Sequence, residues 1–159
     1  MKNTIKLIAD TAHAERAKGL KVMELLNDAD PRGLTLDGVD RIDLQFPKFT
    51  DGRAYSQAFL LRRRLGFQGE LRATGDVLVD QLQLLQRSGF DSAVLRADQD
   101  LAIAQRQLAH FDGFYQGDAV HPQPIFASTD VALDAVKNAA NAPVLTHAQA
   151  TTTPTGATA

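Results

Sequence analysis

The fold is decided by a stretch in the first third of the chain, Arg41-Ile42-Asp43-Leu44-Gln45-Phe46-Pro47-Lys48-Phe49-Thr50-Asp51-Gly52-Arg53. Its first six residues alternate between polar and apolar, which is the period of a β-strand with one buried face. Pro47 has no N–H to donate to a neighbouring strand. Thr50 or Asp51 can accept hydrogen bonds from the free N–H groups of a following helix. The stretch therefore predicts a strand over 41–46 and a helix that begins at Arg53.

The same order of strand, turn and helix recurs further along the chain. The first predicted helix is Arg53–Leu65, and the later pairs are strand Glu70–Thr74 with helix Val77–Arg87 and strand Ser92–Arg96 with helix Gln99–Phe111. The segments Arg64-Leu65-Gly66-Phe67 and Arg87-Ser88-Gly89-Phe90 match at Arg, Gly and Phe. In each, we expect the glycine to end a helix in the left-handed conformation and the phenylalanine to pack back on the last turn. This repeat indicates that the units are built alike, as in a parallel βα array.

The sequence on either side of residues 41–117 is less regular, so we expect three segments: 1–40, 41–117 and 118–159. In the first, Ile5–Ile8 suits a short edge strand, Thr11–Leu26 has the apolar spacing of a peripheral helix, and 27–40 has the composition of a loop. In the last, we expect an extended stretch over 121–124, a weak alanine-rich helix over 129–141 and a disordered tail from Pro143.

Composition places the chain among ordinary globular proteins of one domain. It has 159 residues, of which 44% are hydrophobic and 23% charged, with a net charge of −2. This balance gives no general attraction to nucleic acid or to an anionic membrane, so neither is an expected partner. The chain has no cysteine, which excludes disulfides and cysteine-ligated iron–sulfur clusters. Its longest apolar run falls short of the roughly 20 residues of a spanning helix, and we expect a cytoplasmic protein.

The alternation of the strands has a consequence for the sheet. A parallel sheet covered by helices on both faces should have almost continuously apolar strands. Here one face carries the polar side chains of Asp43, Gln45, Glu70, Arg72 and Thr74. We therefore predict an α/β fold that resembles a half barrel, with three or four βα units and one polar face. That face would be solvated, paired with a second subunit or used as a site. A flavodoxin-like sandwich is the alternative.

Ligands of parallel βα arrays bind at the carboxyl ends of the strands. Arginines together with helix N-termini would suit an oxyanion such as phosphate, sulfate or sulfite, and a carboxylate could serve as a base. The predicted anion-binding residues are Thr50, Asp51, Gly52, Arg53, Arg72, Thr74 and Gly75, and the catalytic candidates are Asp43, Glu70 and Asp76. The structural alternative is an ion-pair network of Arg72 with Glu70 or Asp43 at a buried or dimeric interface.

Several other features are assigned to the protein surface or show no functional motif. The run Arg62-Arg63-Arg64 is interpreted as a solvated helix face, because consecutive residues point in different directions around a helix. The histidines, His13, His110, His121 and His147, are assigned to the surface, since none has metal-ligand spacing. The chain contains neither a glycine-rich dinucleotide fingerprint nor a P-loop. We therefore expect neither a metal nor a cofactor of its own.

Four stretches of this chain resemble a bacterial family of unknown function, the DUF934-like family. They are Phe46–Ser56, Leu60–Gly66, Gly69–Gln81 and Arg87–Asp91, and the resemblance extends over residues 41–116. Members of that family are commonly encoded beside assimilatory sulfite reductase and are often labelled as oxidoreductases. Many carry a cysteine where this chain has Ser88, which argues against a catalytic thiol at that position.

The resemblance implies a role in sulfur assimilation. An accessory protein of sulfite reduction needs no redox centre of its own, because the reductase holds the siroheme and the iron–sulfur cluster. The implied partner is sulfite reductase, and the implied contribution is electron delivery, assembly or substrate handling. Two alternatives remain: a small βα enzyme acting on an anionic substrate, and a structural homodimer whose polar sheet faces meet.

Overall fold

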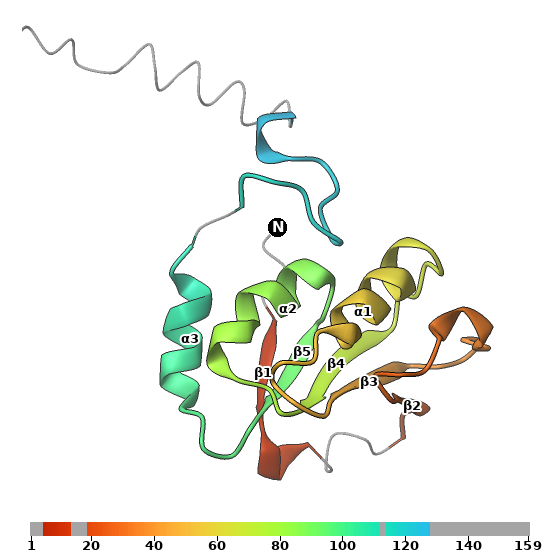
Figure 1. Cartoon of the computed structure of the whole chain (residues 1–159), viewed down its shortest axis with the longest axis horizontal. Coiled ribbons are helices and arrows are strands. Elements are labelled where there is room, and N and C mark those ends of the chain that lie inside the picture. The colour runs from red at the N-terminus through yellow and green to blue at the C-terminus, as the bar shows by residue number, and fades with distance from the viewer. Residues whose placement is uncertain (1–4, 14–18, 112–113, 128–159) are drawn as a thin grey trace, which may run out of the picture. The chain divides into compact units, whose positions relative to one another are not determined.

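The computed structural model describes residues 5–13, 19–111 and 114–127. Within them, five parallel strands form one sheet in the order β1-β5-β4-β3-β2 (Figure 1). The strands are β1 Lys6–Ala9, β2 Val22–Leu25, β3 Arg41–Phe46, β4 Glu70–Gly75 and β5 Ser92–Leu95. The α-helices are α1 Arg53–Arg63, α2 Leu82–Ser88 and α3 Leu101–Ala109. Short 3-10 helices are η1 Asp10–Ala12, η3 Pro31–Gly33, η4 Val79–Gln81 and η5 Ile125–Ala127.

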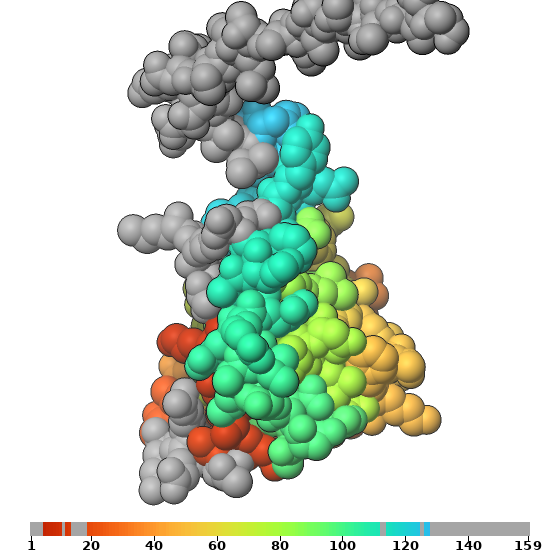
Figure 2. Space-filling view, turned by 90° about the vertical axis from the view of Figure 1, so that its left-hand side faces the viewer, coloured from red at the N-terminus to blue at the C-terminus, as the bar shows by residue number. Residues whose placement is uncertain are grey.

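The helices cover one face of the sheet, as the alternation of the strands predicts. In β3 the apolar side chains Ile42, Leu44 and Phe46 are buried. They belong to one core with the buried side chains of α1, α2, β4 and β5, among them Ala54, Ala58, Leu61, Leu71, Leu82, Leu85 and Phe90. The helices α1 and α2 pack against each other, and α3 lies beside α2 and next to β1 (Figure 2). The predicted parallel array with three βα units is confirmed.

The direction of the crossovers predicts on which face of the sheet each connection between strands lies. From β2 to β5 the strands are consecutive neighbours, and on the helical face α1 connects β3 to β4 and α2 connects β4 to β5. The chain from β1 to β2 travels the opposite way across the sheet. Since crossovers between parallel strands are right-handed, we expect that connection on the face of the sheet opposite α1, α2 and α3. His13 lies there, 3.3 Å from the guanidinium of Arg72 and 3.7 Å from the carboxylate of Asp43.

The predicted helix over Thr11–Leu26 is wrong in its second half, because Val22–Leu25 is the edge strand β2. It pairs with β3, with Val22 opposite Arg41 and Leu25 opposite Leu44. The apolar spacing of this segment suited a helix, but the unpaired edge of β3 offers backbone hydrogen bonds that the sequence does not reveal. The predicted edge strand at Ile5–Ile8 is confirmed as β1, shifted by one residue.

The other helix boundaries differ by a few residues from the sequence prediction, for local reasons. The helix after β5 begins at Leu101, because the carboxylate of Asp100 accepts hydrogen bonds from the N–H groups of Ala102 and Ile103. The helix after β4 starts as η4 before it becomes α2. The repeated glycines are left-handed, at φ +67° for Gly66 and +100° for Gly89. The phenylalanine that follows each glycine is buried, as the repeat predicts.

Chain contacts divide the protein into a first unit, Met1–Ile125, and a second, Phe126–Ala159. The sheet and its three helices belong to the first unit. The helix predicted over 129–141 and the tail predicted from Pro143 lie outside the described residues. None of the helices in the described part of the chain has the length and apolarity needed to cross a membrane.

Candidate functional site

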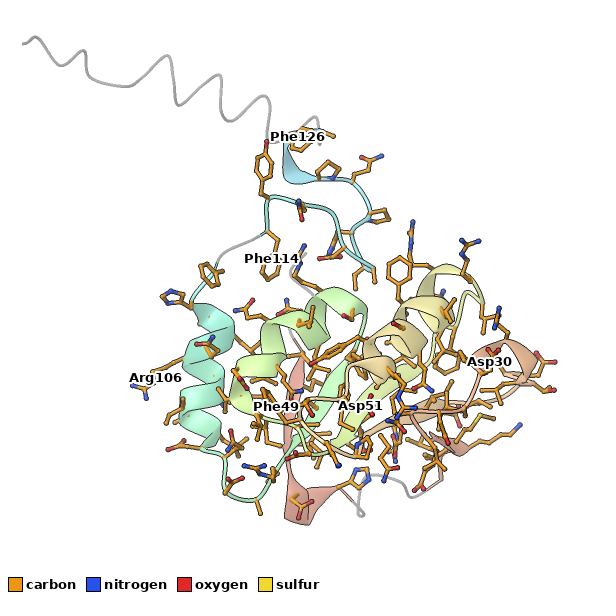
Figure 3. The ribbon with its side chains drawn as sticks, in the orientation of Figure 1. Asp30, Phe49, Asp51, Arg106, Phe114 and Phe126 are labelled. Carbon is orange, nitrogen blue, oxygen red and sulfur yellow. The ribbon has the colours of Figure 1, made fainter. Side chains whose placement is uncertain are left out.

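The first part of the candidate site lies at the carboxyl ends of β2 and β3. Asp51 follows β3, and its carboxylate accepts two side-chain hydrogen bonds from Arg53, at 3.0 and 2.7 Å (Figure 3). The same carboxylate accepts a bond of 2.6 Å from the amide of Asn27, which follows β2. It also accepts the backbone N–H of Arg53 at 3.2 Å, next to the helix cap at Gly52. One carboxylate thus ties two strand ends to the start of α1.

The second part joins the ends of β3, β4 and β5. Asp76 follows β4, and its carboxylate accepts the backbone N–H of Phe49 at 2.8 Å and an Nη of Arg96 at 2.6 Å. Arg96 follows β5 and donates two further hydrogen bonds to Asp98, at 2.6 and 2.8 Å. The guanidinium of Arg96 is therefore shared by two carboxylates. Two of its five N–H groups take no part in these three bonds.

These pairings hold the carboxylates ionised over the whole physiological pH range. The guanidinium of Arg53 lowers the pKa of Asp51 to about 2, and that of Arg96 lowers the pKa of Asp98 to about 2. The backbone N–H of Phe49, followed by Arg96, lowers the pKa of Asp76. All three side chains lie at the solvated edge of the sheet, where the carboxylates serve as acceptors and not as bases poised near neutral pH.

Gly75 and Thr74 have structural roles at the end of β4. Gly75 has φ +90°, and a Cβ at this position would lie 2.4 Å from the carbonyl oxygen of Phe46. The N–H of Asp76 donates to that same oxygen at 2.7 Å. The hydroxyl of Thr74 donates to the carbonyl of Leu44 at 3.4 Å. The close approach of β3 and β4 therefore explains why position 75 is a glycine, which has no side chain.

The face of the sheet opposite α1, α2 and α3 carries the third part of the candidate site, a network of charged side chains. Arg41 donates to both carboxylate oxygens of Asp43, at 2.7 and 3.0 Å. Arg72 donates two hydrogen bonds to Glu70, at 3.1 and 2.8 Å, and its Nε also reaches the hydroxyl of Ser92 at 3.1 Å. That hydroxyl in turn donates to Glu70. We call these five residues, with His13, the face network.

The register of the sheet makes the charges of the face network alternate in two dimensions. Arg41 lies opposite Glu70, and Asp43 lies opposite Arg72, so each charge has an opposite charge on its own strand and on the next. Arg41, Asp43 and Arg72 are 2–3% exposed and Ser92 is fully buried. Burial opposes ionisation of Glu70, but the Ser92 hydroxyl and Arg72 outweigh it and lower the pKa of that carboxyl. Such a buried, mutually satisfied set stabilises a particular sheet register more than it offers a reactive group.

The residues predicted for one site therefore fall into two groups. Thr50, Asp51, Gly52, Arg53, Gly75 and Asp76 lie at or beside the carboxyl edge, whereas Asp43, Glu70 and Arg72 belong to the face network. Thr74 lies between them, in β4. The structure shows Arg72 in an ion pair with Glu70, as the ion-pair alternative predicts. The assignment of the edge residues to anion binding stays a prediction.

Sequence reasoning missed several residues of these networks. Ser92 and His13 come from segments whose positions depend on the sheet order, so neither was linked to Arg72. The interpretation of the arginine run as a solvated face is wrong for Arg62. Its guanidinium donates to the carbonyls of Phe67, Gly69 and Gly89 at 2.8–2.9 Å and pairs with Asp91. Arg62 thus connects the two loops of the Arg-x-Gly-Phe repeat. That repeat is the sequence feature from which this role of Arg62 could have been predicted.

Comparison with known proteins identifies the family of this chain. The family model described as "Bacterial protein of unknown function (DUF934)" matches residues 22–126, from β2 through all three βα units. The chain belongs to the DUF934 family. The resemblance seen in the sequence is thus confirmed, and the DUF934 match extends beyond residues 41–116 on both sides. No curated protein and no solved structure matches this DUF934 chain.

Proposed function

We propose that this chain is an accessory protein of assimilatory sulfite reduction that acts with sulfite reductase in the cytoplasm. The chain belongs to the DUF934 family, and the resemblance of its sequence to that family implies that such proteins are encoded beside sulfite reductase, which supports this proposal. The chain has no cysteine to ligate an iron–sulfur cluster. In this proposal the redox groups therefore belong to the reductase, and the DUF934 chain contributes binding.

The carboxyl edge of the sheet suits a protein partner. Arg53 is paired with Asp51 and Arg96 with Asp76, while apolar side chains beyond the strand ends are exposed: 58% for Leu26, 41% for Phe49 and 38% for Leu101. These follow β2, β3 and β5 respectively. Exposed apolar side chains among neutralised charges are the composition expected where a second protein docks. This edge is the surface that we propose for the reductase.

Growth of a deletion strain tests the pathway. We expect failure on sulfate and sulfite as sole sulfur sources, with normal growth on sulfide and cysteine. That pattern places the chain at the sulfite-reducing step. Normal growth on all four sources, in a strain checked for a second copy of the gene, would remove the support for the sulfur assignment.

Co-purification tests the partner and the surface together. The tagged chain should retain sulfite reductase, and Phe49→Ser should weaken that retention. Phe59→Ser is the matched control, because Phe59 is similarly exposed, at 47%, but lies in the middle of α1. Equal loss with both variants would argue against the carboxyl edge, and no retention by the unaltered chain would argue against a stable complex.

One observation favours a second candidate, the small βα enzyme with an anionic substrate. Arg53 is 59% exposed in its side chain and begins α1, so its guanidinium can reach an anion while it remains bound to Asp51. Calorimetric titration with sulfite, sulfate and phosphate tests it. Binding that Arg53→Ala weakens, and that Arg63→Ala leaves unchanged, would support an anion site. The absence of binding at millimolar concentrations would remove this candidate.

A further inference from the structure

The chain leaves the sheet in opposite directions after two neighbouring strands. β1 and β5 are adjacent and parallel, with Ala9 opposite Leu95 at their carboxyl ends. After β1 the chain passes to the face opposite α1, α2 and α3, where His13 contacts Arg72. After β5 it passes to the helical face, where α3 packs against α2 (Figure 2). Such a divergence is a topological switch point, and it leaves a crevice outside the strand ends that open α/β sheets use for ligands.

A cavity of about 210 Å³ lies at this point. It is lined by the last residue of each of these strands and by residues that follow them: Ala9, Asp10, Leu95, Arg96, Ala97, Gln99 and Leu101. Four of these side chains are apolar, so the walls suit a hydrocarbon group. For comparison, an apolar cavity of about 150 Å³ in another protein holds one benzene molecule. The space here suits a molecule of about six to nine non-hydrogen atoms.

The charged side chains at the cavity determine whether a cation or an anion would bind there. Arg96 is the cation of the lining, and it is already shared by Asp76 and Asp98. In the described part of the chain, no group donates a hydrogen bond to the carboxylate of Asp10. Asp10 and Arg96 both line the cavity, and Arg96 is paired with Asp76 and Asp98, so negative charge exceeds positive charge there and favours a positive group. The carboxylate of Asp10 can accept hydrogen bonds from such a group.

From the topology, the cavity and these charges, we infer that the crevice between the ends of β1 and β5 binds a small organic cation. Its ammonium group would bind Asp10, and its short hydrocarbon part would lie against Leu95 and Leu101. The side-chain oxygen of Gln99 already accepts the N–H of Val79, at 3.1 Å. This site is separate from Arg53 and does not depend on the proposed role in sulfite reduction.

Titration with n-hexylammonium at pH 7, followed by amide chemical shifts of the full-length chain, tests the inference. The probe has seven non-hydrogen atoms and carries its charge at this pH. We expect shifts confined to residues 9–10 and 95–101, with a dissociation constant of about 1 mM, typical for a ligand of this size. Hexanoate and n-hexanol match the hydrocarbon part and serve as the anionic and neutral probes.

Two pairs of variants separate the contributions of charge and space. Asp10→Asn should weaken hexylammonium binding about tenfold, the effect of losing a charge-assisted hydrogen bond, while Asp37→Asn in a distant loop should not. Ala97→Leu should block the cavity, while Ala102→Leu, on the first turn of α3 and outside the lining, should not. Unchanged spectra of the free variants confirm that each is folded.

The inference is wrong if hexanoate or hexanol binds as tightly as hexylammonium, because the carboxylate would then select nothing. It is also wrong if the amides around the cavity do not shift at about ten times the expected dissociation constant. Equal weakening by Asp10→Asn and Asp37→Asn would show a general charge effect in place of a site. Selective loss with Asp10→Asn and Ala97→Leu supports it.

Discussion

Replacing Arg41 by methionine tests whether the face network holds the sheet together. The guanidinium of Arg41 and the carboxylate of Asp43 are joined by two hydrogen bonds of 2.7 and 3.0 Å, and both side chains are 4% exposed or less. Methionine fills much of the same volume but carries no charge. The variant therefore leaves Asp43 buried with His13 at 3.7 Å and its cross-strand neighbour Arg72.

The expected loss follows from the charge separation and the burial. Two unit charges about 4 Å apart attract by about 4 kcal/mol at an effective dielectric constant of 20. Measured costs of removing one partner of a buried pair are about 3–5 kcal/mol. We therefore expect Arg41→Met to lower the free energy of unfolding by about 3–5 kcal/mol, a large part of the roughly 5–15 kcal/mol typical of a domain.

Urea unfolding followed by far-ultraviolet circular dichroism measures this loss, since the chain has no tryptophan for a fluorescence assay. With a denaturant slope of about 1–3 kcal/mol per molar, the midpoint should fall by about 1–5 M. Arg63→Met on the exposed side of α1 is the control and should change stability by less than about 0.5 kcal/mol. Arg41→Lys, which keeps the charge but lacks the planar fork, should fall between them.

The double variant Arg41→Met with Asp43→Leu separates pairing from packing. Removal of both charges should restore most of the stability, because the unpaired carboxylate is gone. A loss of less than 1 kcal/mol with Arg41→Met alone would refute the reasoning. So would a double variant whose loss equals the sum of the two single losses, since additive effects mean that the two side chains are not coupled.

Three further predictions concern other parts of the fold. Gly75→Ala should destabilise the chain by about 1–3 kcal/mol in urea unfolding, because φ is +90° and the added Cβ meets a backbone oxygen, whereas Gly33→Ala, with open space around it, should not. Glu70→Gln should lower the free energy of unfolding by its full amount above pH 4.5 and by less as the pH falls below 4.5, because the folded state lowers the pKa of Glu70. A difference between the two proteins that stays constant as the pH falls would contradict this. Arg62→Ala should cost about 2–4 kcal/mol while Arg63→Ala costs less than about 0.5, and equal thermal midpoints for the two would show that Arg62 is not structural.

The candidate site was accessible to sequence reasoning only in part. Asp51, Arg53 and Asp76 were found because they follow strands that the alternation reveals, and parallel strands bring their carboxyl ends to one edge. Their partners could not be found in this way. Asn27 reaches Asp51 only because residues 22–25 form the edge strand β2, and Arg96 reaches Asp76 only through the register of β4 and β5.

The sequence by itself determined the central βα units, because the signals that encode them are local. The alternation in Arg41–Phe46, the break at Pro47 and the left-handed turns at Gly66 and Gly89 each act over a few residues. Only the tertiary structure decided that Val22–Leu25 is a strand, that Arg62 is held by carbonyls up to 27 positions away, and that β1 lies beside β5. Edge pairing and buried charge pairing join residues distant in the chain, so their partners become defined only when the sheet order is complete.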